Sequence, residues 1–137
     1  MDDYPVRVPI TLHWADMDAL GHVNNARYFT FFETARMALF ERVGLAAAGQ
    51  PEIGPILAHT RCDFLAPVRY PADLVAGTSI ERIGNTSFTM GYAVAHAGGD
   101  VVARGQGVVV LIDYRSETKV AIPGELREKL AALGPAG

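Results

Sequence analysis

The sequence predicts an α+β fold in which a five-stranded antiparallel sheet wraps around one long apolar helix. Apolar and polar residues alternate over residues 6–14, which indicates a half-buried strand. The apolar period then changes to helical spacing over residues 25–43, and four further strand-like runs follow. The apolar face of this helix is so wide that the sheet is expected to curl around it, with a short C-terminal helix completing the fold.

The bulk properties are those of one soluble globular domain covering residues 1–137. Half of the residues are hydrophobic, a fifth are charged, and the formal net charge is −3. The charge, together with the lack of a Lys/Arg run, predicts no nucleic-acid partner, and no apolar run reaches membrane-spanning length. The N-terminal MDDYPVRV lacks the plan of a signal peptide, and the single Cys62 excludes an internal disulfide. We therefore expect a cytoplasmic protein without a membrane partner.

The first strand and the long helix have clear polar and apolar faces. Pro9 in the strand indicates an edge strand or a bulge, and Gly44 is placed to end the helix. The residues expected to face the core are Val6, Val8, Ile10, Leu12 and Trp14 in the strand, and Tyr28, Phe32, Ala35, Leu39 and Val43 in the helix, flanked by Phe29, Phe31 and Phe40.

The second half of the chain predicts strands joined by tight turns. GN at 84–85 and GGD at 98–100 are hairpin-turn signals. Gly105 and Gly107 indicate a bulge or a close approach of another group, and a short helix over 124–133 begins after Pro123. The order of elements predicts a four-stranded antiparallel meander after the long helix. Its strands are expected over residues 56–65, 74–83, 87–97 and 101–114.

A strongly polar stretch, ADMDALGHVNN at residues 15–25, separates the first strand from the helix. Its side chains are costly to bury without partners, so it is either an ordinary polar loop or a site where a carboxylate works. The longer stretch WADMDALGHVNNARYFTFFETAR resembles the motif of the 4-hydroxybenzoyl-CoA thioesterase-like acyl-CoA thioesterases, in the hot-dog fold superfamily. CDFLAPVRYPADLV similarly resembles the second strand and turn of that family. The family pattern Asp-x-Asp-x-x-Gly-His-Val-Asn-Asn is matched by Asp16, Asp18, Gly21, His22, Val23, Asn24 and Asn25, with Tyr28 following.

This resemblance implies a hot-dog fold and hydrolysis of an acyl-coenzyme A thioester to the free acid and CoA. It implies no metal or organic cofactor, and a homo-oligomer (dimer or tetramer) with active sites at the subunit interface. It assigns the catalytic carboxylate to Asp18 and places the backbone N–H of Asn25 at the thioester carbonyl.

The residues also suit this chemistry independently of the family. A thioester needs a carboxylate that attacks the carbonyl or deprotonates water, and donors for the developing oxyanion. A helix beginning near Asn25 supplies unpaired N–H groups and a positive dipole end. Gly21 lets the chain turn tightly between Asp18 and that helix. The alternative for Asp18 is a structural role in an Asx turn or a cap.

Several other residues have both a functional and a structural interpretation. His22 either positions Asp18, binds substrate or orients water, or it is a loop histidine bonded to backbone. Asn24 and Asn25 are expected N-cap residues, and Tyr28 is expected to belong to the core. Asn24 and Tyr28 are also candidates for binding the substrate, Tyr28 in an acyl pocket. Asp16 is expected to bond the loop backbone. Candidates for binding the CoA phosphates, each otherwise a solvated charge, are Arg61, Arg69, Arg82, Arg115 and Lys119.

Two other functions compete with hydrolysis. A hot-dog dehydratase or hydratase would use His22 and Glu33 as a proton shuttle, although Glu33 is better explained by an ion pair with Arg36 three residues on. A non-catalytic acyl-CoA-binding module is the other alternative. The Asp-x-Asp motif favours hydrolysis over both, while the acyl group stays undetermined. The four histidines lack metal-ligand spacing, so no metal site is predicted, and Cys62 is expected to be a buried apolar side chain.

Overall fold

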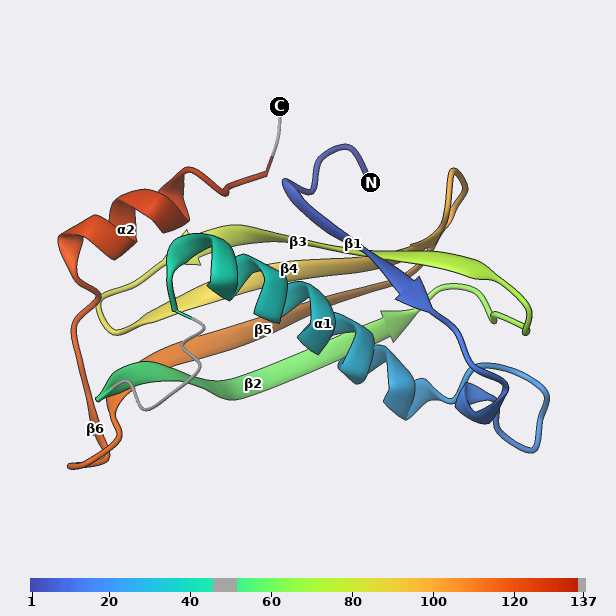
Figure 1. Ribbon diagram of the computed structural model, residues 1–137, viewed down its shortest axis with the longest axis horizontal. Coiled ribbons are helices and arrows are strands. Elements are labelled where there is room, and N and C mark those ends of the chain that lie inside the picture. Colours follow the sequence, from blue (N-terminus) through green and yellow to red (C-terminus); the bar gives the residue numbers. More distant parts are fainter. Residues whose placement is uncertain (46–51, 136–137) are drawn as a thin grey trace.

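The computed structural model describes residues 1–45 and 52–135 (Figure 1). A sheet and a long helix dominate it, and a short 3-10 helix at Trp14–Asp16 precedes the long helix. The strands are β1 (Val6–Thr11), β2 (Ile53–Phe64), β3 (Asp73–Ile83), β4 (Ser87–His96), β5 (Val101–Asp113) and the two-residue β6 (Thr118–Lys119), and the helices are α1 (Asn25–Val43) and α2 (Gly124–Ala131). No helix in this part of the chain is long and apolar enough to cross a membrane.

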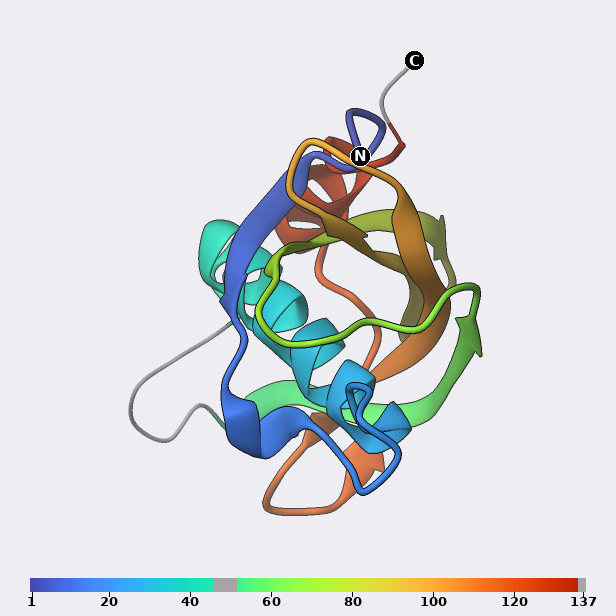
Figure 2. The same cartoon turned by 90° about the vertical axis from the view of Figure 1, so that its right-hand side faces the viewer.

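The sheet is antiparallel, with strand order β1-β3-β4-β5-β2 and β6 beside β5. The predicted sheet of five main strands is confirmed, but the predicted meander is wrong, because β2 pairs with β5 and not with β3. Figure 2 shows the reason: β1 and β2 lie at opposite edges of the curled sheet, with α1 between them, so both flanks of the helix are covered. The segment between β2 and β3 crosses from the β2 edge to the other side of the sheet, where β3 lies next to the edge strand β1.

The helix begins and ends at the predicted residues. Asn24 caps its start, and Gly44 ends it in the left-handed conformation, with φ of 81°. The inward aromatic residues pack on the sheet: Phe32 stacks on Tyr92 with ring centroids 4.8 Å apart, and Phe40 meets Phe88 edge-on. The buried residues of α1 include Tyr28, Phe31, Phe32, Ala35, Leu39, Phe40 and Val43. Each large apolar side chain buried in this way stabilises the fold by about 1.5–3 kcal/mol.

The first strand is shorter than predicted. It ends at Thr11, and Trp14 lies in the 3-10 helix with 73% of its surface exposed, in an edge-on contact with Tyr70. The alternation persists beyond the strand because Leu12 is still buried, so the pattern alone does not show where the pairing stops. Pro9 does lie on an edge strand, where its missing N–H is tolerated.

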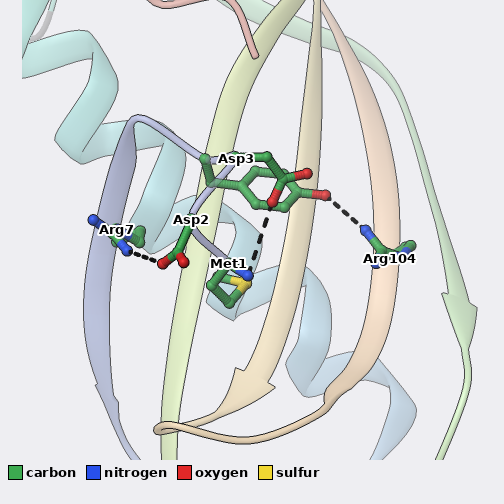
Figure 3. A network of polar contacts seen from close by, with 6 residues as sticks. Met1, Asp2, Asp3, Arg7 and Arg104 are labelled. Atoms are coloured by element: carbon green, nitrogen blue, oxygen red, sulfur yellow. Dashed lines mark hydrogen bonds and ion pairs between the residues drawn. The ribbon is translucent and has the colours of Figure 1, made fainter. Parts of the chain in front are cut away.

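The N-terminal residues cover part of the outer face of the sheet (Figure 3). The Tyr4 ring and the Met1 side chain lie over Gly77, where a Cβ atom would clash with both. Arg104 donates a hydrogen bond of 3.1 Å to the Tyr4 hydroxyl, and Arg7 pairs with Asp2 at 3.3 Å. Because Tyr4 is buried, these contacts fix the chain before β1 begins.

Gly105 explains how the aromatic stack fits inside the sheet. A Cβ atom at this position would lie 2.5 Å from the backbone oxygen of Arg61 and closer still to the Phe32 ring. The predicted close approach is therefore confirmed for Gly105. Phe32 occupies the space that a side chain would take, and this lets it stack on Tyr92.

We predict that Gly105→Ala lowers the free energy of unfolding by about 2–3 kcal/mol, because neither the Arg61 carbonyl nor the buried Phe32 can give way freely. Gly124→Ala is the matched control, since nothing lies within 4 Å of a Cβ atom at that position. It should stay within about 0.5 kcal/mol of wild type. Urea unfolding of the three proteins measures the difference, and equal stability of the two variants would contradict this account of the close approach.

Candidate active site

The polar loop before α1 folds into a small hairpin. Met17 and Val23 form an isolated antiparallel bridge, and the Asp18 N–H donates to the His22 carbonyl at 2.9 Å. The Gly21 N–H closes the turn on the Asp18 carbonyl at 3.1 Å, with φ of 82° at Gly21. Only a glycine adopts that backbone conformation freely, so Gly21 allows the chain to return Asp18 toward the helix start, as predicted.

Asp16 joins this hairpin to the residues before it and to the first turn of α1. Its side chain is buried, accepts a hydrogen bond of 2.8 Å from the His13 N–H, and lies 3.4 Å from the Arg27 guanidinium. Its carbonyl accepts from the Asn24 N–H at 2.9 Å. The predicted structural bond of Asp16 to the loop backbone is thus confirmed, and it ties the loop to the first turn of α1.

The first turn of α1 offers a free backbone donor. The Asn24 side chain accepts from the Ala26 N–H at 2.9 Å, and the Arg27 N–H donates to the Asn24 carbonyl, also at 2.9 Å. Within residues 1–45 and 52–135, nothing accepts a hydrogen bond from the Asn25 N–H. Asn24 is therefore the N-cap, and Asn25 presents an unpaired N–H at the positive end of the helix dipole.

A half-open cavity of about 450 Å³ brings the predicted residues together. The loop hairpin, the start of α1 and the segment after β2 form its walls. The Val23 N–H donates to the Val68 carbonyl at 2.8 Å, which joins the loop to that segment. The cavity is lined by Asp18, His22, Asn24, Asn25 and Tyr28, all expected from the sequence, and by Leu20, Val23, Phe64, Leu65, Ala66 and Pro67.

Asp18 is half-buried at the wall of this cavity. One carboxylate oxygen, Oδ1, accepts from the Leu20 N–H at 2.9 Å, which is the Asx-turn bond considered as the structural alternative. In the described part of the chain, no group donates to the other oxygen, Oδ2. The turn and the reactive role are therefore compatible, because the bond at Oδ1 orients a carboxylate whose Oδ2 is available.

Tyr28 forms the deep aromatic side of the cavity. It is 2% exposed and makes edge-on contacts with Phe31 and Phe64, at centroid distances of 5.6 and 5.2 Å. Burial, with a smaller effect of the nearby Cys62, raises the pKa of the Tyr28 hydroxyl. The hydroxyl is therefore protonated at neutral pH, and Tyr28 acts as a neutral wall of the cavity.

Cys62 lies near Tyr28 but is poorly suited to react. It is half-buried on β2, and burial together with the Asp63 carboxylate raises the pKa of its thiol to about 11. A thiol with that pKa carries almost no thiolate at neutral pH. Within the described ranges, no group of three or more His, Cys, Asp or Glu residues is placed to hold a metal ion.

The residues considered for phosphate binding or for the dehydratase reaction lie outside the cavity, with the exception of His22: Arg61, Arg69, Arg82, Arg115, Lys119 and Glu33. Arg61 lines a separate hollow of about 340 Å³ and pairs with Asp63 at 3.2 Å. Arg69 is exposed, two residues after the cavity residue Pro67. Glu33 is exposed on α1 and lies 3.8 Å from Arg36, which confirms the predicted ion pair.

The sequence analysis missed the contribution of the segment after β2. Leu65, Ala66 and Pro67 reach the cavity only because β2 lies at the far edge and its connection to β3 crosses the start of α1 (Figure 2). The predicted meander places β2 beside β3, and such a pair needs no crossing segment. Leu20 was also missed, although an apolar residue in a polar turn, here 82% exposed, is a signal that the sequence contained.

Comparison with known proteins identifies the family. The family model of the thioesterase-like superfamily matches residues 12–130. The chain belongs to this superfamily. The predicted thioesterase family and hot-dog fold are therefore confirmed, and the matched range includes all the lining residues of the cavity.

Individual relatives of this chain also support its place in the thioesterase-like superfamily. It is 28% identical over 119 residues to the long-chain acyl-CoA thioesterase FadM of Escherichia coli, covering 85% of this chain and 90% of FadM. The crystal structure of the PA5185 protein of Pseudomonas aeruginosa is 38% identical, with a TM-score of 0.89 and coverage of 98% and 95%. A thioesterase of Thermus thermophilus, solved in complex with coenzyme A and Zn, is 29% identical, with a TM-score of 0.83 and coverage of 97% and 96%.

Proposed function

We propose that this protein is an acyl-CoA thioesterase, which hydrolyses an acyl-coenzyme A thioester to the free acid and CoA. The observation that carries the proposal is that Asp18, with one carboxylate oxygen unbonded, and Asn25, with an unpaired N–H, line the same half-open cavity in the described part of the chain. The Escherichia coli relative named as a long-chain acyl-CoA thioesterase and the coenzyme A complex of the Thermus relative support the choice of substrate class.

In the proposed reaction the thioester carbonyl lies between these two groups. The Asn25 N–H donates to the carbonyl oxygen, and the helix dipole stabilises the negative charge that develops there. Asp18 Oδ2 then acts in one of two ways. It attacks the carbonyl carbon to form a mixed anhydride that water hydrolyses, or it takes a proton from a water molecule that attacks the carbon. Both routes expel the CoA thiolate, which takes up a proton, and both restore the carboxylate.

The remaining cavity residues support this chemistry. His22 lines the cavity, and its carbonyl accepts the hydrogen bond from the Asp18 N–H. We assign the His22 side chain to positioning water or the substrate thioester. Asn24 fixes the helix start through its cap, so its role is to position the Asn25 N–H. Tyr28 supplies an apolar surface for the acyl group.

Arg69 is the best placed of the five cationic residues considered for the CoA phosphates. It follows the segment that borders the cavity, and none of the ion pairs among the described residues includes it. Arg61 is already paired with Asp63 and lines the separate hollow. We therefore propose a phosphate contact for Arg69 first, with Arg61 as the second candidate.

The dehydratase alternative finds less support in the geometry. It needs His22 and Glu33 to share one substrate, yet Glu33 is exposed on α1, is paired with Arg36, and does not line the cavity. A binding module without catalysis would not need a carboxylate with an unbonded oxygen and an unpaired N–H in the lining of one cavity.

We also propose that the protein forms a homo-oligomer through the β2 edge. β2 is a twelve-residue edge strand, and a long edge strand with exposed apolar side chains favours pairing with another chain. Ile53, Ile56 and Leu57 on this strand are 43%, 47% and 37% exposed. A second copy, related by a two-fold axis, would pair its own β2 there and place another chain next to the cavity residue Phe64.

A substitution at Asp18 tests the proposed reaction. Asp18→Asn keeps the size and the acceptor at Oδ1 but removes the charge and basicity, so kcat for acyl-CoA hydrolysis should fall at least about 10²-fold. The release of free CoA thiol from a panel of acyl-CoA esters measures this, with circular dichroism and light scattering as checks on fold and assembly. Glu33→Gln is the control and should keep most of the activity. A dead Glu33→Gln enzyme beside an active Asp18→Asn enzyme would overturn the proposal.

The oligomeric state in solution tests the proposed β2 interface. Light scattering at micromolar concentration should show a dimer or a tetramer for the wild type. Ile56→Lys should shift it toward smaller species, because two lysines would be buried at a paired β2 edge. Ala131→Lys, at an exposed position of α2, is the matched control and should not change the assembly. A monomeric wild type, or no difference between the two variants, would rule out this interface.

A further inference from the structure

We propose that Phe64 sets the length of the acyl group that the cavity accepts; this inference rests on the proposed thioesterase function. Phe64 is the last residue of β2 and is 43% exposed, with its ring lining the cavity. It makes an edge-on contact with Tyr28, at a centroid distance of 5.2 Å, and both residues line the cavity.

The structure shows what lies behind this aromatic pair. Side chains at alternate positions of a strand point to the same face, so Cys62 follows Phe64 along the inner side of β2. Cys62 is half-buried, packs against the core and does not line the cavity. Beyond it, the stacked Phe32 and Tyr92 rings are almost completely buried, so core side chains occupy the space behind the pair. Phe64 is therefore the exposed aromatic residue of the cavity lining, with Tyr28 as its buried neighbour.

The position of the reacting groups makes this aromatic pair the end of the acyl subsite. Asp18, His22 and Asn25 are polar residues of the cavity lining, and the thioester has to lie against them for the proposed reaction. An acyl chain that avoids these polar groups extends toward the apolar residues, and Tyr28 and Phe64 are the aromatic ones among them. Tyr28 is held by the core at 2% exposure, whereas Phe64 can be truncated without removing a fully buried side chain. Phe64 is thus the residue whose size changes the space for the chain.

The test uses the full chain and a series of straight-chain acyl-CoA esters of increasing length. Phe64→Ala should raise kcat/KM for long chains relative to short chains by at least about tenfold, since each additional methylene in an apolar pocket is worth that order of discrimination. Phe64→Trp should shift the preference in the opposite direction. Phe29→Ala is the matched control, because Phe29 is a similarly exposed phenylalanine, 38%, on α1 and does not line the cavity.

A second measurement does not depend on turnover. Cys62 is the only cysteine of the chain, so labelling by a thiol reagent reports on it alone. If Phe64 covers the way to Cys62, labelling should be several times faster in Phe64→Ala than in wild type and unchanged in Phe29→Ala.

The outcomes separate this inference from the function on which it rests. An active wild type whose chain-length profile is the same in Phe64→Ala, Phe64→Trp and Phe29→Ala would overturn the role of Phe64 and leave the thioesterase function standing. A folded wild type that hydrolyses none of the esters would overturn the proposed function, and the role of Phe64 with it. Faster labelling without a change of profile would show that Phe64 covers Cys62 but does not limit the acyl group, which also overturns the inference.

Discussion

The enclosure of α1 by the sheet is the constraint on which the rest of the structure depends. A helix with so wide an aromatic face cannot be covered by a flat sheet, and β1 and β2 at opposite edges bring the sheet around both flanks (Figure 2). The packing is so close that the Phe32 ring occupies the space that a side chain at position 105 would need. The helix axis is fixed in this way, so the position of the helix start is fixed as well.

The candidate site follows from that position. The start of α1 lies at the open end of the curled sheet, where its first N–H groups are not used by the helix itself. The buried Asp16 holds the loop against this end, and the Val23–Val68 bond joins it to the segment after β2. The Asn25 N–H and Asp18 Oδ2 are among the polar groups of this wall that have no partner in the described part of the chain. A fixed donor beside a half-buried carboxylate is what thioester hydrolysis requires.

Local patterns predicted much of this arrangement, while long-range pairing was not accessible to them. The spacing of apolar residues and the signals at Asn24 and Gly44 located α1, because caps and periodicity are local properties. The motif placed Asp18, His22 and Asn25 in one loop, and the structure brings them to one cavity. The partner of β2 depends on how both flanks of α1 are covered, which no local pattern encodes. Leu65 and Pro67 were consequently missed, and Arg61 lies in a different hollow.

The central claim is that the Asn25 N–H at the start of α1 binds the oxygen of the thioester carbonyl while Asp18 faces its carbon. A crystal structure of the Asp18→Asn variant with a bound acyl-CoA tests it most directly. The account predicts the carbonyl oxygen within hydrogen-bond distance of the Asn25 nitrogen, about 2.7–3.1 Å, and the carbonyl carbon facing the side chain at position 18. A thioester bound elsewhere, or bound in this cavity with its carbonyl turned away from the helix start, would contradict it.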